Sequence, residues 1–226
     1  MVRRIASKPE EGDLIKLEGM KLYDGGRAPN PRRVQILMAE KGLDIERIQV
    51  DIAKLEQKSP EFTQINPLQR LPVLMLDDGT VIAETVAICR YLEELYPDPP
   101  LMGTDAKDRA IVEMWQRRVE FGFLMPVGFA FRHQHPGAAA LEQPQVAEWA
   151  EINRPKAREF MEFLDAELAN RPFVAGERFT IADISAYVAY RFLKPGRIPA
   201  PEDLANLQRW YGETAARPSV QETTQG

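Results

Sequence analysis

The chain has 226 residues, of which 44% are hydrophobic and 28% are charged, and its formal net charge is −5. This is the composition of an ordinary soluble globular protein, and a weakly negative chain has no broad electrostatic attraction to nucleic acid or to an anionic membrane. The single cysteine, Cys89, excludes an intramolecular disulfide framework and suits a reducing compartment, so we expect the cytoplasm. No apolar run is long enough to predict a membrane span.

Residues 1–19 carry no recognisable targeting signal. They lack the apolar core of a secretory signal, and Glu10, Glu11 and Asp13 argue against a transit peptide. We therefore expect a polar extension that packs loosely or not at all.

The elements that follow predict a small α/β domain. A strand at residues 20–23 precedes a helix, which Pro31 opens and Gly42 ends, and a second strand at residues 45–50. This β-α-β order has the length of one crossover unit.

A β-hairpin and a helix complete the predicted domain. Apolar runs at residues 73–76 and 81–83 are joined by Asp77-Asp78-Gly79-Thr80, and Asp-Gly between apolar runs is a strong hairpin signal. A helical stripe then begins at Thr85 and stops before Pro97. The pattern favours a small sheet covered by helices.

Beyond the proline-rich segment Pro97-Asp98-Pro99-Pro100 the pattern is all-helical. We expect helices at residues 106–131, 145–169, 182–192 and 203–216. Thr180 followed by Asp183 predicts a capping box for the third of them. The predicted division is an N-terminal extension, an α/β domain, a linker and an all-helical domain, at residues 1–19, 20–97, 98–106 and 107–226.

Two short motifs suggest a ligand site. Leu71-Pro72 stands just before a strand, where a cis bond would turn the chain and free backbone groups to pair with a ligand; the alternative is an ordinary trans proline that opens a strand. Glu84-Thr85 stands where the hairpin meets a helix N-terminus, which can hold a carboxylate while Glu84 accepts from an ammonium group. The pair suits an α-amino acid head, and simple helix capping is the alternative.

These motifs together resemble a known family. Asn66-Pro67-Leu68-Gln69-Arg70-Leu71-Pro72-Val73-Leu74, with Asp78-Gly79 and Glu84-Thr85, is similar to the glutathione site of cytosolic glutathione transferases. Phe173-Val174-Ala175-Gly176 and Phe179-Thr180-Ile181-Ala182-Asp183 are similar to the capping motif of their helical domain. The resemblance implies a thioredoxin-like N-terminal domain, an all-α C-terminal domain, glutathione as co-substrate without a metal, and a homodimer.

The resemblance also implies which residues bind glutathione. The set is Asn30, Gln57, Lys58, Arg70, Leu71, Pro72, Glu84 and Thr85. Within it, Leu71 offers its backbone to the cysteinyl part with Pro72 in the cis form. Gln57 and Lys58 match positions that reach the glycine carboxylate, although Lys58 can equally be a solvated lysine.

The residue that activates the thiol departs from the family pattern. Many relatives have serine or cysteine at the position matched by Ala28, and alanine can neither donate a hydrogen bond nor form a mixed disulfide. Asn30 is the expected catalytic residue, because its amide is a neutral donor beside a helix N-terminus. Capping the helix is its alternative role, and Tyr23 is a rival donor. Arg32 and Arg33 add positive potential, or Arg33 is structural.

A second-substrate pocket is expected against the long helix after the linker. Phe121, Met125 and Phe129 supply aromatic and flexible apolar surface there, although such residues are more often core. His133 and His135 without further ligands make a weak metal motif, so we expect no metal.

We expect an enzyme that binds glutathione as thiolate. The thiolate either attacks an apolar electrophile or reduces a peroxide or a disulfide, the last with two glutathione molecules and no protein cysteine. The alternative that Ala28 favours is a non-catalytic protein that binds glutathione or an apolar ligand. A structural module that only binds partners is a third possibility.

Overall fold

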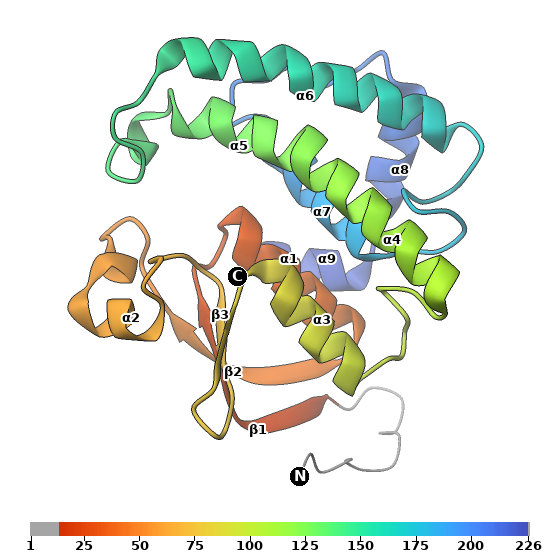
Figure 1. Cartoon of the computed structure of the whole chain (residues 1–226). Helices are drawn as coiled ribbons and strands as arrows, with labels where there is room; N and C mark the ends of the chain where they lie inside the picture. The colour runs from red at the N-terminus through yellow and green to blue at the C-terminus, as the bar shows by residue number, and fades with distance from the viewer. Residues whose placement is uncertain (1–13, 226) are drawn as a thin grey trace.

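The computed structural model describes residues 14–225, so most of the expected N-terminal extension lies outside the described residues. An α/β domain is followed by an all-helical domain (Figure 1). The elements of the first domain are β1 (Ile15–Asp24), α1 (Pro29–Glu40), β2 (Leu43–Gln49), the 3-10 turn η1 (Glu56–Lys58), α2 (Pro60–Ile65), β3 (Val73–Met75), β4 (Val81–Ala83) and α3 (Thr85–Leu95).

The four strands form one mixed sheet in the order β2-β1-β3-β4. β1 runs parallel to β2 and antiparallel to β3, and β3 runs antiparallel to β4. α1 and α3 lie between the sheet and the helical domain, whereas α2 lies away from them at the left of Figure 1. The predicted thioredoxin-like fold is confirmed.

The first strand is longer than its sequence pattern indicates. It begins at Ile15, whose amide donates to Gly42 O at 2.7 Å, and not at Met20. The register shifts between Lys16 and Lys21, and Gly19 within this irregular stretch has φ +83°. A bulge at a glycine breaks the alternation of side chains, which is why the pattern points to a start at Met20. Residues 15–19 therefore belong to the strand and not to an extension.

The second domain contains the four expected helical segments and further short ones. Its elements are α4 (Ala106–Val119), the π-helical segment η2 (Glu120–Leu124), α5 (Met125–Arg132), the 3-10 turn η3 (Pro136–Ala138), α6 (Ala147–Leu168), α7 (Ile181–Arg191), α8 (Ala205–Ala215) and α9 (Pro218–Gln225). The expected helix at residues 106–131 is thus interrupted by a π-helical segment. Pro126 has no N–H for an α-helical bond to Gly122, which accounts for the change of winding.

The main hydrophobic core is continuous across both domains. It includes Leu37 and Ile88 from the first domain and Val119 and Ile184 from the second. A smaller core of Val50, Phe62, Leu71 and Val73 lies on the α2 side of the sheet. The domains therefore share an apolar interface, against which α1 is fixed.

The predicted capping box is present at the start of α7. The Asp183 carboxylate accepts from Thr180 N at 2.9 Å, from Val174 N at 2.8 Å and from Trp210 Nε1 at 2.9 Å. Burial raises the pKa of Asp183, and these hydrogen bonds oppose that rise. The motif joins α7, α8 and the preceding loop in the domain core.

Candidate active site

The strand pairing brings several loops to one edge of the sheet. Val73 at the start of β3 pairs with Tyr23 near the end of β1 and with Ala83 at the end of β4. Leu71-Pro72 therefore lies beside the loop that leads to α1 and beside the start of α3. Because β2 is parallel to β1, it ends at the same edge and leads to η1. All the segments that carry the predicted glutathione-binding residues start from this edge.

The loop before β3 is shaped by an asparagine. Asn66 Nδ2 donates to Arg70 O at 2.9 Å, and Asn66 Oδ1 accepts from Leu68 N at 3.1 Å. The peptide bond between Leu71 and Pro72 is cis. A Cβ atom at Gly25 would lie 3.2 Å from Leu71 Cδ1, so the β1–α1 loop packs directly on this turn.

The start of α3 has no side-chain cap. Glu84 is exposed, with a positive φ of 71°, and its side chain makes no capping hydrogen bond. Its carbonyl accepts the helical bond from Ile88 N at 3.0 Å. Thr85 beside it is buried. The amide groups of a first turn without such a cap attract an anion, as expected for a site that holds a carboxylate.

Gln57 and Lys58 lie in η1, and their environments differ. Gln57 is buried, and no described residue bonds to its Oε1 atom. A buried amide oxygen without a partner is unusual and points to a missing donor. Lys58 is exposed, and its Nζ donates to Ala140 O at 2.6 Å, in the loop between α5 and α6. An ammonium group has three donors, so this contact between domains is compatible with a carboxylate as well.

A buried polar cluster fixes the loop that leads to Asn30. The Asp24 carboxylate is fully buried at the end of β1, and Gln35 Nε2 donates to its two oxygens at 2.9 and 2.8 Å. The same nitrogen donates to Gly26 O at 3.1 Å, and Gly26 N donates to Asp24 Oδ1 at 2.9 Å. The turn before α1 is therefore held from within the domain.

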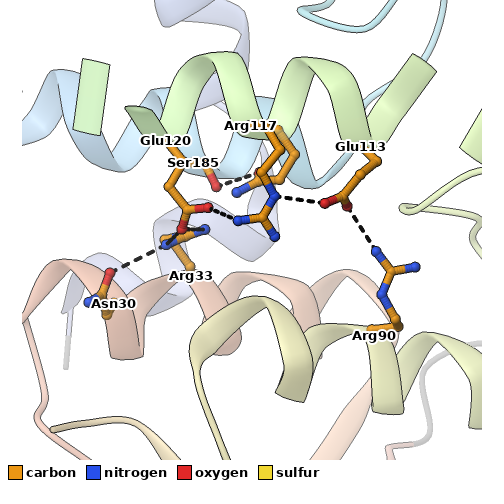
Figure 2. Close-up of polar contacts among 8 residues, drawn as sticks. Asn30, Arg33, Arg90, Glu113, Arg117, Glu120 and Ser185 are labelled. Atoms are coloured by element: carbon orange, nitrogen blue, oxygen red, sulfur yellow. Dashed lines mark hydrogen bonds and ion pairs between the residues drawn. The ribbon is translucent and has the colours of Figure 1, made fainter. Parts of the chain in front are cut away.

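Asn30 does not cap α1. The helix begins at Pro29, two residues earlier than expected, and its N-cap is Ala28, which makes no side-chain capping bond. Asn30 is exposed, and its Oδ1 atom accepts from Arg33 Nη1 at 3.3 Å (Figure 2). The capping role that competed with catalysis is therefore wrong. Tyr23, the rival donor, packs its ring edge-on against Phe62 at 5.9 Å.

A chain of charged side chains runs from Asn30 across the domain interface (Figure 2). Arg33 is 1% exposed and pairs with Glu120 of η2 at 3.3 Å. Glu120 also accepts from Arg117, which contacts Glu113, and Glu113 accepts from Arg90 of α3. Sequence reasoning missed Glu120. Its spacing from Arg117 signals an exposed helical pair but says nothing of a partner in the other domain.

The residues of the expected second-substrate pocket have different surroundings. Phe121 is exposed on a groove of about 320 Å³ between η2, α5 and α6, and Met125 is exposed as well. Phe129 packs its ring 5.9 Å from that of Trp149. A second pocket of about 440 Å³ lies beside η1, and its lining residues are Gly25, Gly26, Gln49, Val50, Asp51, Ile52, Ala53 and Glu56.

The remaining candidates have ordinary roles. His133 Nδ1 accepts from Val146 N at 3.2 Å, and His135 Nδ1 accepts from Gly137 N at 3.1 Å. Among residues 14–225, no group of three or more His, Cys, Asp or Glu side chains could hold a metal ion. Cys89 is fully buried, and burial raises its pKa to about 12. Within the same range, no helix has the length and apolar character to cross a membrane.

Comparison with known proteins identifies the family. The glutathione S-transferase N-terminal domain matches residues 18–94, and the glutathione S-transferase C-terminal domain matches residues 123–218. Glutathione S-transferase 2 of Saccharomyces cerevisiae is 36% identical over 92% of this chain and 91% of its own length.

Solved structures agree with this match. A glutathione S-transferase domain-containing protein of Marinobacter aquaeolei VT8 has a TM-score of 0.85 and 38% identity, over 88% of this chain and 99% of that chain. Gtt2 of Saccharomyces cerevisiae has a TM-score of 0.84 and 36% identity, over 90% of this chain and 99% of that chain. The chain therefore belongs to the glutathione S-transferase family, and it is a glutathione transferase.

Proposed function

We propose that the enzyme binds glutathione across the edge of the sheet where β1 and β4 end and β3 begins. The open N-terminus of α3 at Thr85 holds the γ-glutamyl carboxylate, and Glu84 accepts from the ammonium group of that residue. The backbone of Leu71, turned by Pro72, pairs with the cysteinyl part.

The other end of glutathione points toward η1 in this proposal. Gln57 and Lys58 bind the glycine end, and Arg70 completes the proposed set. The observation that carries the proposal is that these groups share one edge, where the buried Gln57 Oε1 has no partner among the described residues. A ligand N–H donor would satisfy this atom.

Asn30 is the proposed catalytic residue. A thiol has a pKa of about 8.5, so a donor and a helix N-terminus beside the sulfur are needed to keep it ionised at neutral pH. The thiol proton passes to water, and the Asn30 amide donates to the thiolate. The sulfur then bonds to an electrophilic carbon while the leaving group departs with its electron pair. With a peroxide, two thiols are oxidised to a disulfide, and the peroxide is reduced to an alcohol and water.

The second substrate is proposed to be a small apolar electrophile or peroxide, which makes the reaction a detoxification. Phe121, Met125 and Phe129 remain the proposed contacts. We also propose a homodimer in the cytoplasm. In this proposal a second copy covers exposed apolar side chains of the helical domain, among them Met114 and Phe163. Sedimentation at micromolar concentration tests it.

Calorimetric titration with glutathione tests the site, and thiolate absorbance across pH tests the activation. The Asn30→Ala variant should raise the pKa of the bound thiol by about one unit, because one neutral hydrogen bond contributes about 1 to 1.5 kcal/mol. The Thr85→Val variant is the matched control, since it should weaken binding more than it moves the thiol pKa. An unchanged thiol pKa in Asn30→Ala would remove Asn30 from the mechanism.

Ala28 favours one alternative, a protein that binds glutathione without turning it over. Its signature would be tight binding by the wild-type protein with a thiol that titrates as in free glutathione. Absence of binding would leave the glutathione site itself without support.

A further inference from the structure

The side-chain amide of Asn30 has two unlike ends, and the structure distinguishes them. Its oxygen can only accept a hydrogen bond, and its nitrogen can only donate. Arg33 Nη1 lies 3.3 Å from Asn30 Oδ1, and a guanidinium group can only donate (Figure 2). The oxygen is therefore turned toward Arg33. The Nδ2 donor is left for whatever approaches this exposed end of α1.

Arg33 is itself held in place. Its side chain is 1% exposed, and its Nη1 and Nη2 atoms donate to Glu120 Oε1 at 3.4 and 3.3 Å. The Gln116 amide has a hydrogen-bond partner at both ends when it is oriented with its oxygen toward Arg33. The oxygen then accepts from Arg33 Nη2 at 2.8 Å, and the nitrogen donates to Ile181 O at 3.1 Å. Moving this guanidinium elsewhere would strand a buried charge, which is costly. Its orientation is therefore fixed.

Glu120 belongs to the other domain. It stands at the first position of the π-helical segment, and its second oxygen accepts from Arg117 Nη1 at 2.8 Å. A segment wound in this way directs side chains differently from a regular α-helix, and such segments occur often at functional sites. The helical domain thus fixes Arg33, and Arg33 contacts the amide of Asn30.

We infer that Arg33, held by Glu120, is a positioning residue that turns the Asn30 amide so that its nitrogen faces the thiol of glutathione. The inference rests on the proposed role of Asn30 as donor to the thiolate. It makes thiol activation in the first domain depend on a carboxylate of the second. In this account Arg33 acts through Asn30, not through its own charge.

A double-mutant cycle separates these two ways of acting. The variants are Asn30→Ala, Arg33→Lys and the two combined, each saturated with glutathione and titrated by thiolate absorbance. Lysine keeps the positive charge but loses the planar fork that reaches both Asn30 and Glu120. We expect Arg33→Lys to raise the thiol pKa by about 0.5 to 1 unit in the wild-type background and to change nothing further when Asn30 is alanine. The Kd for glutathione at pH 5, where the thiol is protonated, should change less than about twofold.

The Glu120→Gln variant keeps the inference testable if Arg33→Lys does not fold. Loss of a negative charge would by itself lower the thiol pKa, whereas exchange of the charged partner of Arg33 for a weaker neutral acceptor should raise it. The Arg90→Gln variant, at the far end of the chain of charges, is the matched control with no expected shift.

The outcomes separate the inference from the proposed function. If Asn30→Ala leaves the thiol pKa unchanged, the role of Asn30 fails and the inference falls with it. If Asn30→Ala raises the thiol pKa but Arg33→Lys does not, or if the two effects add fully, only the inference is overturned. A rise in Arg33→Lys that disappears in the double variant supports it.

Discussion

The two ends of α1 meet the rest of the molecule in different ways. At its C-terminal end, Lys41 Nζ lies 2.6 Å from Glu93 Oε2 and donates to Tyr96 O at 2.8 Å and to Pro99 O at 2.7 Å. At its N-terminal end, Arg33 pairs with Glu120, which is partly exposed, and contacts the exposed Asn30. The first set is closed and buried, whereas the second set ends at a group that faces the proposed ligand.

The two ends of α1 are therefore expected to serve different purposes, the Lys41 end stability and the Asn30 end the proposed chemistry. Lys41 is completely buried and donates to the carbonyl groups of Tyr96, at the end of α3, and Pro99, in the linker, so it fixes how the first domain leads into the second. In the site that we propose, the contact between Arg33 and the Asn30 oxygen leaves the Asn30 amide nitrogen for glutathione. We therefore expect substitutions at one end to change mainly the free energy of unfolding, and substitutions at the other to change mainly the thiol pKa.

The largest expected effect is on stability at the buried end. Lys41→Met leaves the Glu93 carboxylate buried without its ammonium partner, which should cost about 3 to 5 kcal/mol of unfolding free energy in urea titrations. The double variant Lys41→Met/Glu93→Leu should recover most of that loss, because no charge then stays buried. If Lys41→Met lowers the unfolding free energy by less than about 1 kcal/mol, the buried end of α1 is not the stabilising end that we describe.

A second pair near this end should matter less. Arg217 donates to both oxygens of Glu40 at 2.8 Å, and this pairing raises the pKa of Arg217. The Arg217 side chain is 31% exposed, so Arg217→Gln should cost only about 1 to 2 kcal/mol. Thermal unfolding measures it, with Arg217→Lys as the control that keeps the charge. Equal losses in both variants would mean that the paired geometry contributes more than the charge.

The charges of Arg33 and Lys41 both act on Cys89, a buried residue of α3 whose thiol makes stability depend on alkaline pH. Burial raises its pKa from 9.0 to about 12, so the unfolded chain releases this proton first as the pH rises. The stability that the protonated thiol contributes is complete below pH 9 and falls between pH 9 and about 12. At pH 10 about 1.4 kcal/mol of it is lost. Urea titrations of wild type and Cys89→Ala at pH 7 and 10 test it. Equal pH dependence in both would be the contrary result.

The smallest effect on stability and on the thiol pKa is expected at Arg90, the last of the charged side chains that connect to Arg33. Arg90 has a side chain that is 48% exposed and pairs with Glu113 at 2.8 Å. An exposed pair of this kind contributes little, so Arg90→Gln should change the unfolding free energy by less than about 0.5 kcal/mol. Neither urea titration nor thiolate absorbance should show a larger change. A clear shift in the thiol pKa would mean that Arg90 of α3 also takes part in thiol activation, which we do not expect.

Local signals in the sequence were enough to predict the fold. Asp78-Gly79 marks the hairpin and Thr180 with Asp183 marks the start of α7, because these residues act through bonds within a few positions of themselves. The start of β1 was not predictable in the same way, since the bulge at Gly19 hides the period of two. α9 was missed because its eight residues are too few for a clear helical period.

Candidate site residues could be named from the sequence, but their contacts could not. Leu71 and Glu84 could be singled out from turn and helix-start signals, whereas Asn30 was chosen through the resemblance to glutathione transferases. That Glu120 would reach Arg33, 87 positions away, depends on how the two domains pack. No local pattern encodes such a contact. The same applies to Lys58 and Ala140, which lie 82 positions apart.

Thiol activation by this enzyme is tested by the thiol pKa of glutathione bound to the wild-type protein, followed by thiolate absorbance from pH 5 to 10. If Asn30 and the helix N-terminus activate the thiol without a hydroxyl or thiol at position 28, the bound thiol should titrate at least about one unit below its free value. Bound glutathione that titrates like free glutathione would contradict that claim, and would favour binding without catalysis.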